Sequence, residues 1–544
     1  MKHVAIDLTP LLPGGDNGGA KPLAIELIRH LALGAPECRF TLLTNEKSHE
    51  ELRILDAPNV ERLCTTQPES AASLSLRMSL RLRRLLVRFL PESALASLAR
   101  LYNTLFPAGA APPGTPLLRQ IQAELLFCPF TGVLFFDRSV PVVSLVHDLQ
   151  YLTYPEFFEP EVRQERDRHF RQVCRLAGRI VCVSSFTRSA VLEQSPDLPP
   201  DRVIAILSAP QHRLSPPSAT ALANVTARLG LAPGRYLLYP ANFWRHKNHE
   251  LLLTAFALYR AAHRASDLKL VLTGAPGDRR DYLIDATRRM GLENSVVFPG
   301  YLPDDEFAAL LSCCAAVIFP SLFEGFGMPV LEAIAAPVPV LCANRTSLPE
   351  VAGDAVLFFD PRRPAEMVDA IHRIETELPL RGALVEKGKQ RLAAFAGPAQ
   401  MAARYLAVFE DLLRNPVEMA PAVYGVFPDG WTSDRVTVVF GASAEARRLT
   451  VTLKAPEWLP SEAISIRVLP GGEIHRMPRG SVQDFTRELP SGASGTFELC
   501  CTPTFQPSQS GGDDHRSLGC LLESATIFGP DGAAQPLPTH ADAA

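Results

Sequence analysis

Two successive series of short apolar runs, alternating with longer helical patterns, constrain the fold of this chain most. Between residues 1 and 205, stretches such as Lys21–Leu33 and Glu161–Ala177 carry apolar residues at helical spacing. The apolar runs between such stretches are Val4–Leu8, Phe40–Leu43, Leu125–Cys128, Val142–His147 and Ile180–Ser184. Alternation of this kind predicts a parallel sheet covered by helices.

A second series of the same kind follows from Tyr236 onward. Its apolar runs are Tyr236–Tyr239, Lys269–Thr273, Ser295–Phe298, Ala316–Phe319, Val338–Cys342 and Ala355–Phe358. We therefore expect an α/β chain with two Rossmann-like lobes, residues 1–205 and 206–415, the second ending in a helical segment, Gln400–Arg414. Open parallel sheets bind ligands beyond the carboxyl ends of their strands, so the site is expected in the cleft between the lobes.

The texture changes after Pro416. Short alternating runs follow at Arg435–Phe440, Leu449–Leu453, Ile464–Val468 and Thr496–Cys500, with glycine-rich turn signals between them. They predict an all-β, sandwich-like module over residues 425–529. Residues 530–544, rich in Pro, Ala and Asp, are expected to form a flexible tail.

Composition places the chain among ordinary globular proteins. Hydrophobic residues make up 47% and charged residues 21% of its 544 residues, and the net charge is −4. That balance gives no bulk attraction to nucleic acid, so we expect no nucleic-acid partner. The eleven cysteines lack metal-ligand spacing, and no apolar stretch is long enough to span a membrane. With no signal peptide recognised, we expect a cytoplasmic protein with reduced cysteines.

The segment Phe319-Pro-Ser-Leu-Phe-Glu-Gly-Phe-Gly-Met-Pro-Val-Leu-Glu carries the most chemistry. It reads as the end of a buried strand, a glycine-containing loop and the start of a helix, whose free N–H groups favour an anion such as a diphosphate. Glu324 and Glu332 would then accept hydrogen bonds from hydroxyls on either side of that anion. By spacing alone, Glu332 equally fits a residue that complements the helix dipole, and Glu324 a solvated loop residue.

This segment resembles the signature of the retaining glycosyltransferases of family 4, which have the two-lobed GT-B fold. The carrying pattern is Glu324, seven intervening residues, then Glu332. The resemblance implies that Glu324 binds hydroxyls of the donor sugar and Glu332 the nucleotide ribose. It also implies backbone contacts to the donor from Gly325, Phe326 and Gly327.

A basic segment of the second lobe fits the same family. Tyr239-Pro-Ala-Asn-Phe-Trp-Arg-His-Lys-Asn-His resembles the family's strand-to-helix segment that holds the donor diphosphate. Lys247 and Arg245 would stabilise the charge that develops on the departing nucleoside diphosphate. Family members commonly place the arginine differently, so Lys247 is the closer match.

Two further matches lie in the first lobe. Ser144-Leu-Val-His-Asp begins at the carboxyl end of a strand, so His147 would face the cleft and, by resemblance, reach the transferred sugar. Asp148 would orient His147 or cap the next segment. The stretch Leu12-Pro-Gly-Gly-Asp-Asn-Gly-Gly resembles the family's glycine loop, in which Gly18 and Gly19 would line the donor or acceptor side.

One insertion in the first lobe carries five arginines between Arg77 and Arg88 and, from Ala71 to Pro91, no acidic residue. Within Ser73–Phe106, leucines interleave with Arg77, Arg81, Arg83, Arg84 and Arg88. One interpretation is a basic amphipathic helix that touches an anionic membrane surface or a lipid-phosphate acceptor, which would make the protein peripheral at the inner face of a membrane. The other is a helix with solvated arginines.

Together these features predict a metal-independent, retaining transferase that moves a sugar from a nucleotide-diphosphate donor to a glycan or lipid-linked acceptor in bacterial polysaccharide or lipopolysaccharide synthesis. No Asp-x-Asp is placed to hold a catalytic metal, and no cofactor is expected. The basic and His-Asp segments favour the mannosyltransferase-like branch, hence GDP-mannose. The alternatives are a nucleotide-sugar epimerase of the same fold and a non-catalytic carbohydrate-binding protein.

Overall fold

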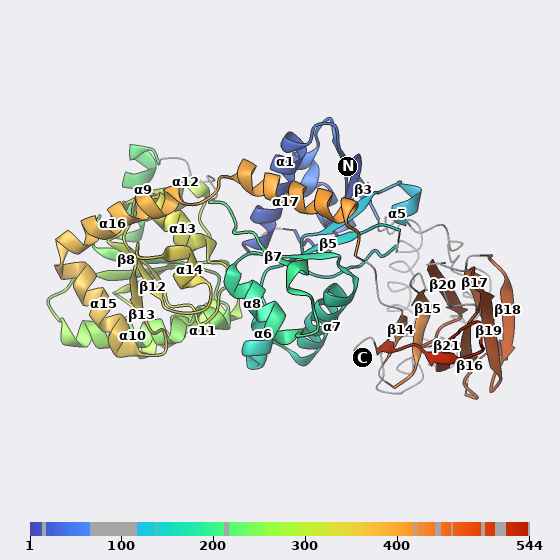
Figure 1. Cartoon of the computed structure of the whole chain (residues 1–544). Coiled ribbons are helices and arrows are strands. Elements are labelled where there is room, and N and C mark those ends of the chain that lie inside the picture. Colours follow the sequence, from blue (N-terminus) through green and yellow to red (C-terminus); the bar gives the residue numbers. More distant parts are fainter. Residues whose placement is uncertain are drawn as a thin grey trace, which may run out of the picture. The chain divides into compact units, whose positions relative to one another are not determined.

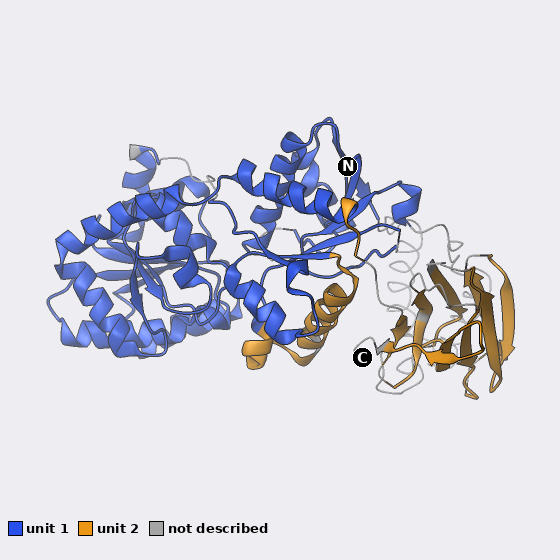
Figure 2. Cartoon of the chain, in the orientation of Figure 1, with its two compact units in different colours: residues 1–150, 179–413 blue, residues 151–178, 414–544 orange. Residues whose placement is uncertain are grey.

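The computed structural model describes residues 1–13, 18–65, 117–137, 139–210, 217–417, 422–427, 429–440, 448–458, 461–469, 471–490, 495–505 and 518–541. They divide into two compact units, residues 1–150 with 179–413, and residues 151–178 with 414–544 (Figure 2). The arginine-rich segment 73–106, expected to meet a membrane, lies outside the described residues, as do residues 14–17 of the glycine loop.

The first lobe is built on a seven-stranded parallel sheet with the order β3-β2-β1-β4-β5-β6-β7. Its strands are β1 (His3–Asp7), β2 (Arg39–Thr44), β3 (Val60–Cys64), β4 (Leu125–Cys128), β5 (Val142–Val146), β6 (Arg179–Cys182) and β7 (Val203–Ala205). The helices of this lobe that belong to the same compact unit as its sheet are α1 (Ala20–Gly34), α2 (Glu46–His49), α5 (Leu117–Gln120) and α8 (Ser185–Gln194). Short 3-10 turns lie at Glu51–Leu55 and Pro200–Arg202. Strand order reverses between β1 and β4, which is where such a sheet binds ligands.

The second lobe has a six-stranded parallel sheet with the order β10-β9-β8-β11-β12-β13. Its strands are β8 (Tyr236–Pro240), β9 (Lys269–Thr273), β10 (Val296–Gly300), β11 (Ala316–Phe319), β12 (Val340–Ala343) and β13 (Leu357–Phe359). Its helices are α9 (Ala219–Leu229), α10 (His249–Ala262), α11 (Asp278–Arg289), α12 (Asp304–Cys313), α13 (Met328–Ala335), α14 (Leu348–Ala352), α15 (Pro364–Thr376) and α16 (Leu378–Ala393). Helices α9, α12, α13 and α16 cover one face, and α10, α11 and α15 the other (Figure 1).

The helical segment that we expected to end the second lobe returns to the first. It forms α17 (Pro398–Arg414), whose Tyr405 and Phe409 rings lie 5.7 and 5.3 Å from the ring of Phe127 on β4. Asp411 of α17 also accepts a hydrogen bond of 2.7 Å from Arg179 at the start of β6. An amphipathic pattern predicts a helix but not the sheet against which it packs. We therefore expected this helix to belong to the second lobe, which precedes it in the sequence.

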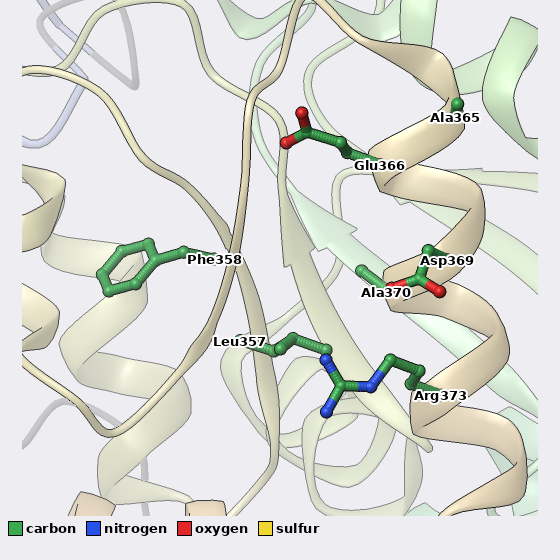
Figure 3. Close-up of a pocket in the computed structure, with 7 residues that line it drawn as sticks. All are labelled: Leu357, Phe358, Ala365, Glu366, Asp369, Ala370 and Arg373. Carbon is green, nitrogen blue, oxygen red and sulfur yellow. The ribbon is translucent and has the colours of Figure 1, made fainter.

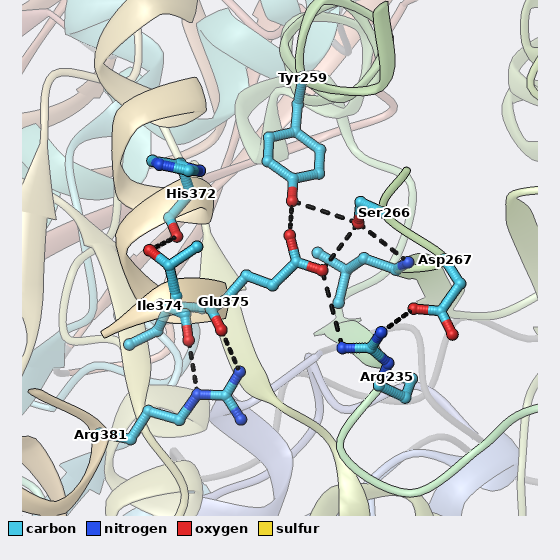
Figure 4. A network of polar contacts seen from close by, with 10 residues as sticks. Arg235, Tyr259, Ser266, Asp267, His372, Ile374, Glu375 and Arg381 are labelled. Carbon is cyan, nitrogen blue, oxygen red and sulfur yellow. Dashed lines mark hydrogen bonds and ion pairs between the residues drawn. The ribbon is translucent and has the colours of Figure 1, made fainter. Parts of the chain in front are cut away.

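A polar network joins α10 and α15, which lie on the same face of the second lobe (Figure 4). Tyr259 of α10 donates a hydrogen bond to Glu375 of α15, and Ser266 donates another of 2.8 Å to the same carboxylate. Arg235 lies 3.9 Å from Glu375. Burial raises the pKa of Glu375 despite the opposing charges of Arg235 and Arg381.

The second compact unit holds α6 (Gln150–Thr153) from its second residue on, a 3-10 turn at Pro155–Phe157, α7 (Pro160–Leu176) and a β module. The module has two sheets, of orders β18-β17-β20-β15-β14-β23 and β19-β16-β21-β22. Its strands are β14 (Ala422–Val426), β15 (Thr432–Phe440), β16 (Arg448–Lys454), β17 (Ala463–Leu469), β18 (Ile474–Pro478), β19 (Val482–Glu488), β20 (Gly495–Thr502), β21 (Leu521–Phe528), β22 (Ala534–Pro536) and β23 (Thr539–Ala541). Both sheets contribute to one apolar core, as the alternating pattern predicts.

The C-terminal segment differs from the expected flexible tail. Within residues 530–544, β22 pairs with β21, and β23 pairs in parallel with β14. Each short strand joins the edge of a larger sheet, where the ladder partner rather than local composition fixes its conformation. The fold otherwise confirms the predicted class: two parallel α/β lobes and an antiparallel β module.

Candidate active site

The topology of the second lobe brings the two sequence motifs together. Strands β8 and β11 are neighbours where the strand order reverses. The basic segment follows β8 and the glutamate segment follows β11, so both leave the same edge of the sheet. Lys247 and Glu324, 77 residues apart, meet there at 2.5 Å between Nζ and Oε1. Figure 1 labels β8 within the lobe.

The Lys247–Glu324 pair is an ion pair with little exposure to water. The two side chains are 12% and 13% exposed. Burial alone would raise the pKa of Glu324, but the charge of Lys247, with a smaller contribution from His246, holds it below its ordinary value of 4.5. Glu324 is therefore an ionised hydrogen-bond acceptor at neutral pH.

A second set of contacts fixes the backbone on both sides of the pair. The buried Tyr239 hydroxyl donates to the carbonyl of Lys247 at 2.9 Å and lies 3.2 Å from the hydroxyl of Ser321. Asn248, in the left-handed conformation with φ +60°, donates to the carbonyl of Pro320 at 3.1 Å. The contacts of Tyr239 with Ser321 and of Asn248 with Pro320 join the β8 segment to the β11 segment, and the hydrogen bond to the Lys247 carbonyl holds the basic segment on its own strand. The pair is therefore held by these hydrogen bonds as well as by its charges.

The loop after Glu324 leads directly into α13. Gly327 has φ +101°, and a Cβ there would lie 2.6 Å from Leu348. Phe326 is buried, and its ring lies edge-on to Phe395 at 6.3 Å. Glu332, half-buried, follows one turn into α13. The predicted donor residues of this segment therefore lie on one loop and one helix.

Arg245 differs from Lys247 in its surroundings. Both belong to a single 3-10 turn, Arg245–Lys247, but the side chain of Arg245 is exposed. The structure thus brings Lys247 to Glu324 and leaves Arg245 at the rim of the same turn.

His147 follows β5 in the first lobe and approaches the glutamate loop. Its Nε2 lies 2.7 Å from the carbonyl oxygen of Pro129, which only accepts, so Nε2 carries the proton and Nδ1 is the acceptor. Burial lowers the pKa of His147, which favours this neutral form. A Cβ at Gly325 would lie 2.0 Å from the His147 carbonyl oxygen, so only glycine fits this approach of the two lobes.

The described part of the glycine loop meets the basic segment. Gly18 has φ +54°, and a Cβ there would lie 2.8 Å from the ring of Trp244, next to Arg245. Gly19 has no heavy atom within 4 Å of such a Cβ and precedes α1. Of the two glycines predicted to line the site, Gly18 therefore makes the contact between lobes.

Sequence reasoning missed three polar residues that join the lobes. Ser184 and Thr187 of the first lobe both donate to the carbonyl of Gly325, at 2.7 and 3.2 Å. Glu350 of the second lobe accepts from backbone N–H groups at the start of α8. The run Val183-Ser-Ser-Phe-Thr carries an N-cap signal. That its side chains bind the Gly325 carbonyl of the other lobe depends on the tertiary structure, which the local sequence does not predict.

The rest of the described residues adds little to this site. Among them, no group of three or more His, Cys, Asp or Glu side chains could hold a metal ion. No helix among them is long and apolar enough to cross a membrane. A pocket of 350 Å³ lies between β13 and α15 and is lined by Leu357, Phe358, Ala365, Glu366, Asp369, Ala370 and Arg373 (Figure 3). It includes no residue of the predicted site.

Comparison with known proteins finds a matching family and solved structures of similar fold. Residues 229–391, which hold both motifs, match the family described as Glycosyl transferases group 1. Among solved structures, HepE of Anabaena in complex with UDP and glucose superposes with a TM-score of 0.54 at 16% identity, over 76% of this chain and all of that one. The two lobes therefore have the GT-B fold of glycosyltransferases.

Two similar curated proteins are mannosyltransferases of Escherichia coli. The O-antigen chain mannosyltransferase B is 33% identical over 234 residues, which is 43% of this chain. The serotype-specific mannosyltransferase WbdA is 30% identical over 224 residues, 40% of this chain. The matched region spans 60% of the first relative and 27% of the second.

Proposed function

We propose that the chain is a retaining glycosyltransferase that moves a sugar from a nucleotide-diphosphate donor to a glycan or lipid-linked acceptor in bacterial polysaccharide or lipopolysaccharide synthesis. One observation carries the proposal: the shielded Lys247–Glu324 pair at the strand-order reversal, inside the region that matches the glycosyltransferase family. The mannosyltransferase names of the relatives support mannose, and hence GDP-mannose as donor.

The ion pair suits a donor that carries both hydroxyls and a diphosphate. Glu324, ionised beside Lys247, accepts hydrogen bonds from hydroxyls of the donor sugar. Lys247, with Arg245 at the rim, balances the charge that grows on the leaving diphosphate. Glu332 and the backbone of Gly325, Phe326 and Gly327 hold the nucleotide side of the donor. Each charge of the pair thereby finds a partner on the donor, so binding leaves neither charge unpaired.

The transfer itself needs positioning more than a tuned base. The acceptor hydroxyl approaches the face that the diphosphate leaves, and a diphosphate oxygen takes its proton, so the anomeric configuration is retained. His147, neutral with Nδ1 as acceptor, binds a hydroxyl of the transferred sugar from the first lobe. In this scheme Lys247 and Arg245 supply the positive charge, and no metal or other cofactor is used.

The test uses the full-length protein with GDP-mannose, UDP-glucose and UDP-galactose, each with and without a mannose-containing acceptor glycan. Release of nucleoside diphosphate that depends on the acceptor supports transfer, and proton NMR of the product reads the anomeric configuration. Isomerisation of the donor sugar without acceptor would establish the epimerase instead. Binding of the acceptor glycan without turnover of any donor would establish the carbohydrate-binding protein.

A further inference from the structure

The start of helix α8 in the first lobe is capped by a residue of the second lobe. The first N–H groups of a helix have no intrahelical partner. In α8, Ser185 N–H donates to Oε1 of Glu350 at 2.9 Å, and Phe186 N–H donates to Oε2 at 3.1 Å. One carboxylate therefore satisfies two orphan donors across the cleft and places its charge at the positive end of the helix dipole.

The same helix end holds the glutamate loop. The hydroxyl of Ser184, the N-cap of α8, accepts from Thr187 N–H at 3.0 Å and donates to the carbonyl of Gly325 at 2.7 Å. The Phe186 ring lies edge-on to Phe323 at 5.7 Å between centroids. Gly325 directly follows Glu324, so contacts that fix Gly325 also fix the position of the catalytic carboxylate.

We propose that Glu350, Ser184 and Thr187 form an interlobe latch. When it is closed, it holds Gly325, and with it the neighbouring Glu324, next to the His147 backbone of the first lobe. The latch is made entirely of side chain to backbone contacts between the lobes, so any opening of the cleft breaks it. Glu350 is a positioning residue: it contacts neither donor nor acceptor and acts through α8 and Gly325. The role in turnover rests on the proposed transferase function, whereas the capping of α8 does not.

The first arm of the test measures amide hydrogen exchange by mass spectrometry on the full chain, over a peptide that spans Ser185 and Phe186. The first amides of a helix are normally unprotected, so protection in the wild type reports the latch. Glu350→Ala is expected to speed their exchange by about tenfold or more, because two charge-assisted hydrogen bonds are lost. Glu350→Gln keeps one acceptor oxygen and is expected to fall between the two.

The second arm measures transfer. Glu350→Ala is expected to lower kcat by about tenfold or more, because a small misplacement of the reacting groups is costly. Binding of GDP or UDP, whichever nucleotide the wild type releases, is expected to change less than about threefold, because Lys247 and Glu332 both belong to the second lobe. Glu350→Gln should restore part of kcat.

Glu366→Ala is the matched control. Glu366 caps a backbone N–H in the same way, at 2.8 Å from Asp360, but within the second lobe. It should leave kcat and the exchange of Ser185 and Phe186 unchanged. Unaltered exchange in Glu350→Ala, or a kcat equal to that of Glu366→Ala, would overturn the latch while the transferase function stands. If the wild type transfers no sugar, the proposed function fails, and the exchange arm still decides whether the cap exists.

Discussion

Two carboxylates of the second lobe, Glu324 and Glu375, have the same exposed fraction, yet their pKa values are shifted in opposite directions. Each is 13% exposed. Lys247 contacts Glu324 at 2.5 Å and keeps its pKa below 4.5, whereas Arg235 lies 3.9 Å from Glu375 and does not offset burial, which raises that pKa. The neutral hydroxyls of Tyr259 and Ser266 provide the close contacts of Glu375 (Figure 4).

The difference distinguishes a candidate ligand-binding glutamate, Glu324, from a glutamate that stabilises the fold, Glu375. Glu324 follows the carboxyl end of β11, the edge at which an open parallel sheet binds ligands, and the charge of Lys247 keeps it ionised. Glu375 joins α10 to α15, and its partners hold two helices together. The role of such a glutamate is therefore inferred from its partners and its place in the fold, because the exposed fraction of the side chain is the same in both cases.

Removing the cation should have the largest effect. Lys247→Ala is expected to lower kcat by about 10²–10³-fold, because charge stabilisation at the leaving group is usually the largest catalytic contribution. Glu332→Ala should instead raise the donor KM through the lost ribose contact. Steady-state kinetics at varied donor concentration separates the loss of kcat from the rise in KM. Full activity of both variants would show that Lys247 and Glu332 do not belong to the active site.

A methyl group in the interlobe contact should come next. Gly325→Ala would place a Cβ 2.0 Å from the His147 carbonyl oxygen, and overpacking of this kind costs about 1–3 kcal/mol. We expect a lower melting temperature and about tenfold or greater loss of kcat as the lobes separate. Gly382→Ala, in α16 and with no atom within 4 Å of the added Cβ, is the control and should keep the wild-type kcat. Equal behaviour of the two variants would argue against close approach of the lobes.

The smallest effect is the pH dependence of stability, and its sign differs between the carboxylates. The lowered pKa of Glu324 gives stability that is present above 4.5 and lost as pH falls through its folded pKa. The raised pKa of Glu375 gives stability that is present below 4.5 and lost as pH rises through its folded pKa. As pH rises from about 3 to about 5, the melting temperature of Glu324→Gln should fall further below that of the wild type. As pH rises above about 4.5, the melting temperature of Glu375→Gln should rise relative to that of the wild type. Parallel pH curves for the two variants would contradict the opposite shifts.

Much of the fold followed from the sequence because buried parallel strands are continuous apolar runs. Leu125–Cys128, Lys269–Thr273 and Ala316–Phe319 were predicted with their observed bounds. Strand β3, Val-Glu-Arg-Leu-Cys, and the three-residue β7 were missed because one is half polar and the other very short. Both take their conformation from the neighbouring strand rather than from local pattern.

The candidate site residues could be named from the sequence, but the contacts between them could not. The resemblance to the family signature singled out Glu324 and Lys247, yet nothing in the local sequence shows that two residues 77 positions apart are in contact. The contact follows from the strand order of the second sheet. Glu350 was missed for the same reason, because its hydrogen-bond partners lie 164 and 165 residues away.

The most direct test compares Glu324→Gln with Glu375→Gln in one assay, the acceptor-dependent release of nucleoside diphosphate. Both substitutions keep the side-chain shape and remove one ionisable carboxyl of equal exposure. We expect Glu324→Gln to lose about 10²-fold or more in kcat/KM, because it loses contacts made to the reacting sugar, and Glu375→Gln to stay within about threefold of wild type. Wild-type activity in Glu324→Gln, or an equal loss in both variants, would contradict the assignment of Glu324 to the active site.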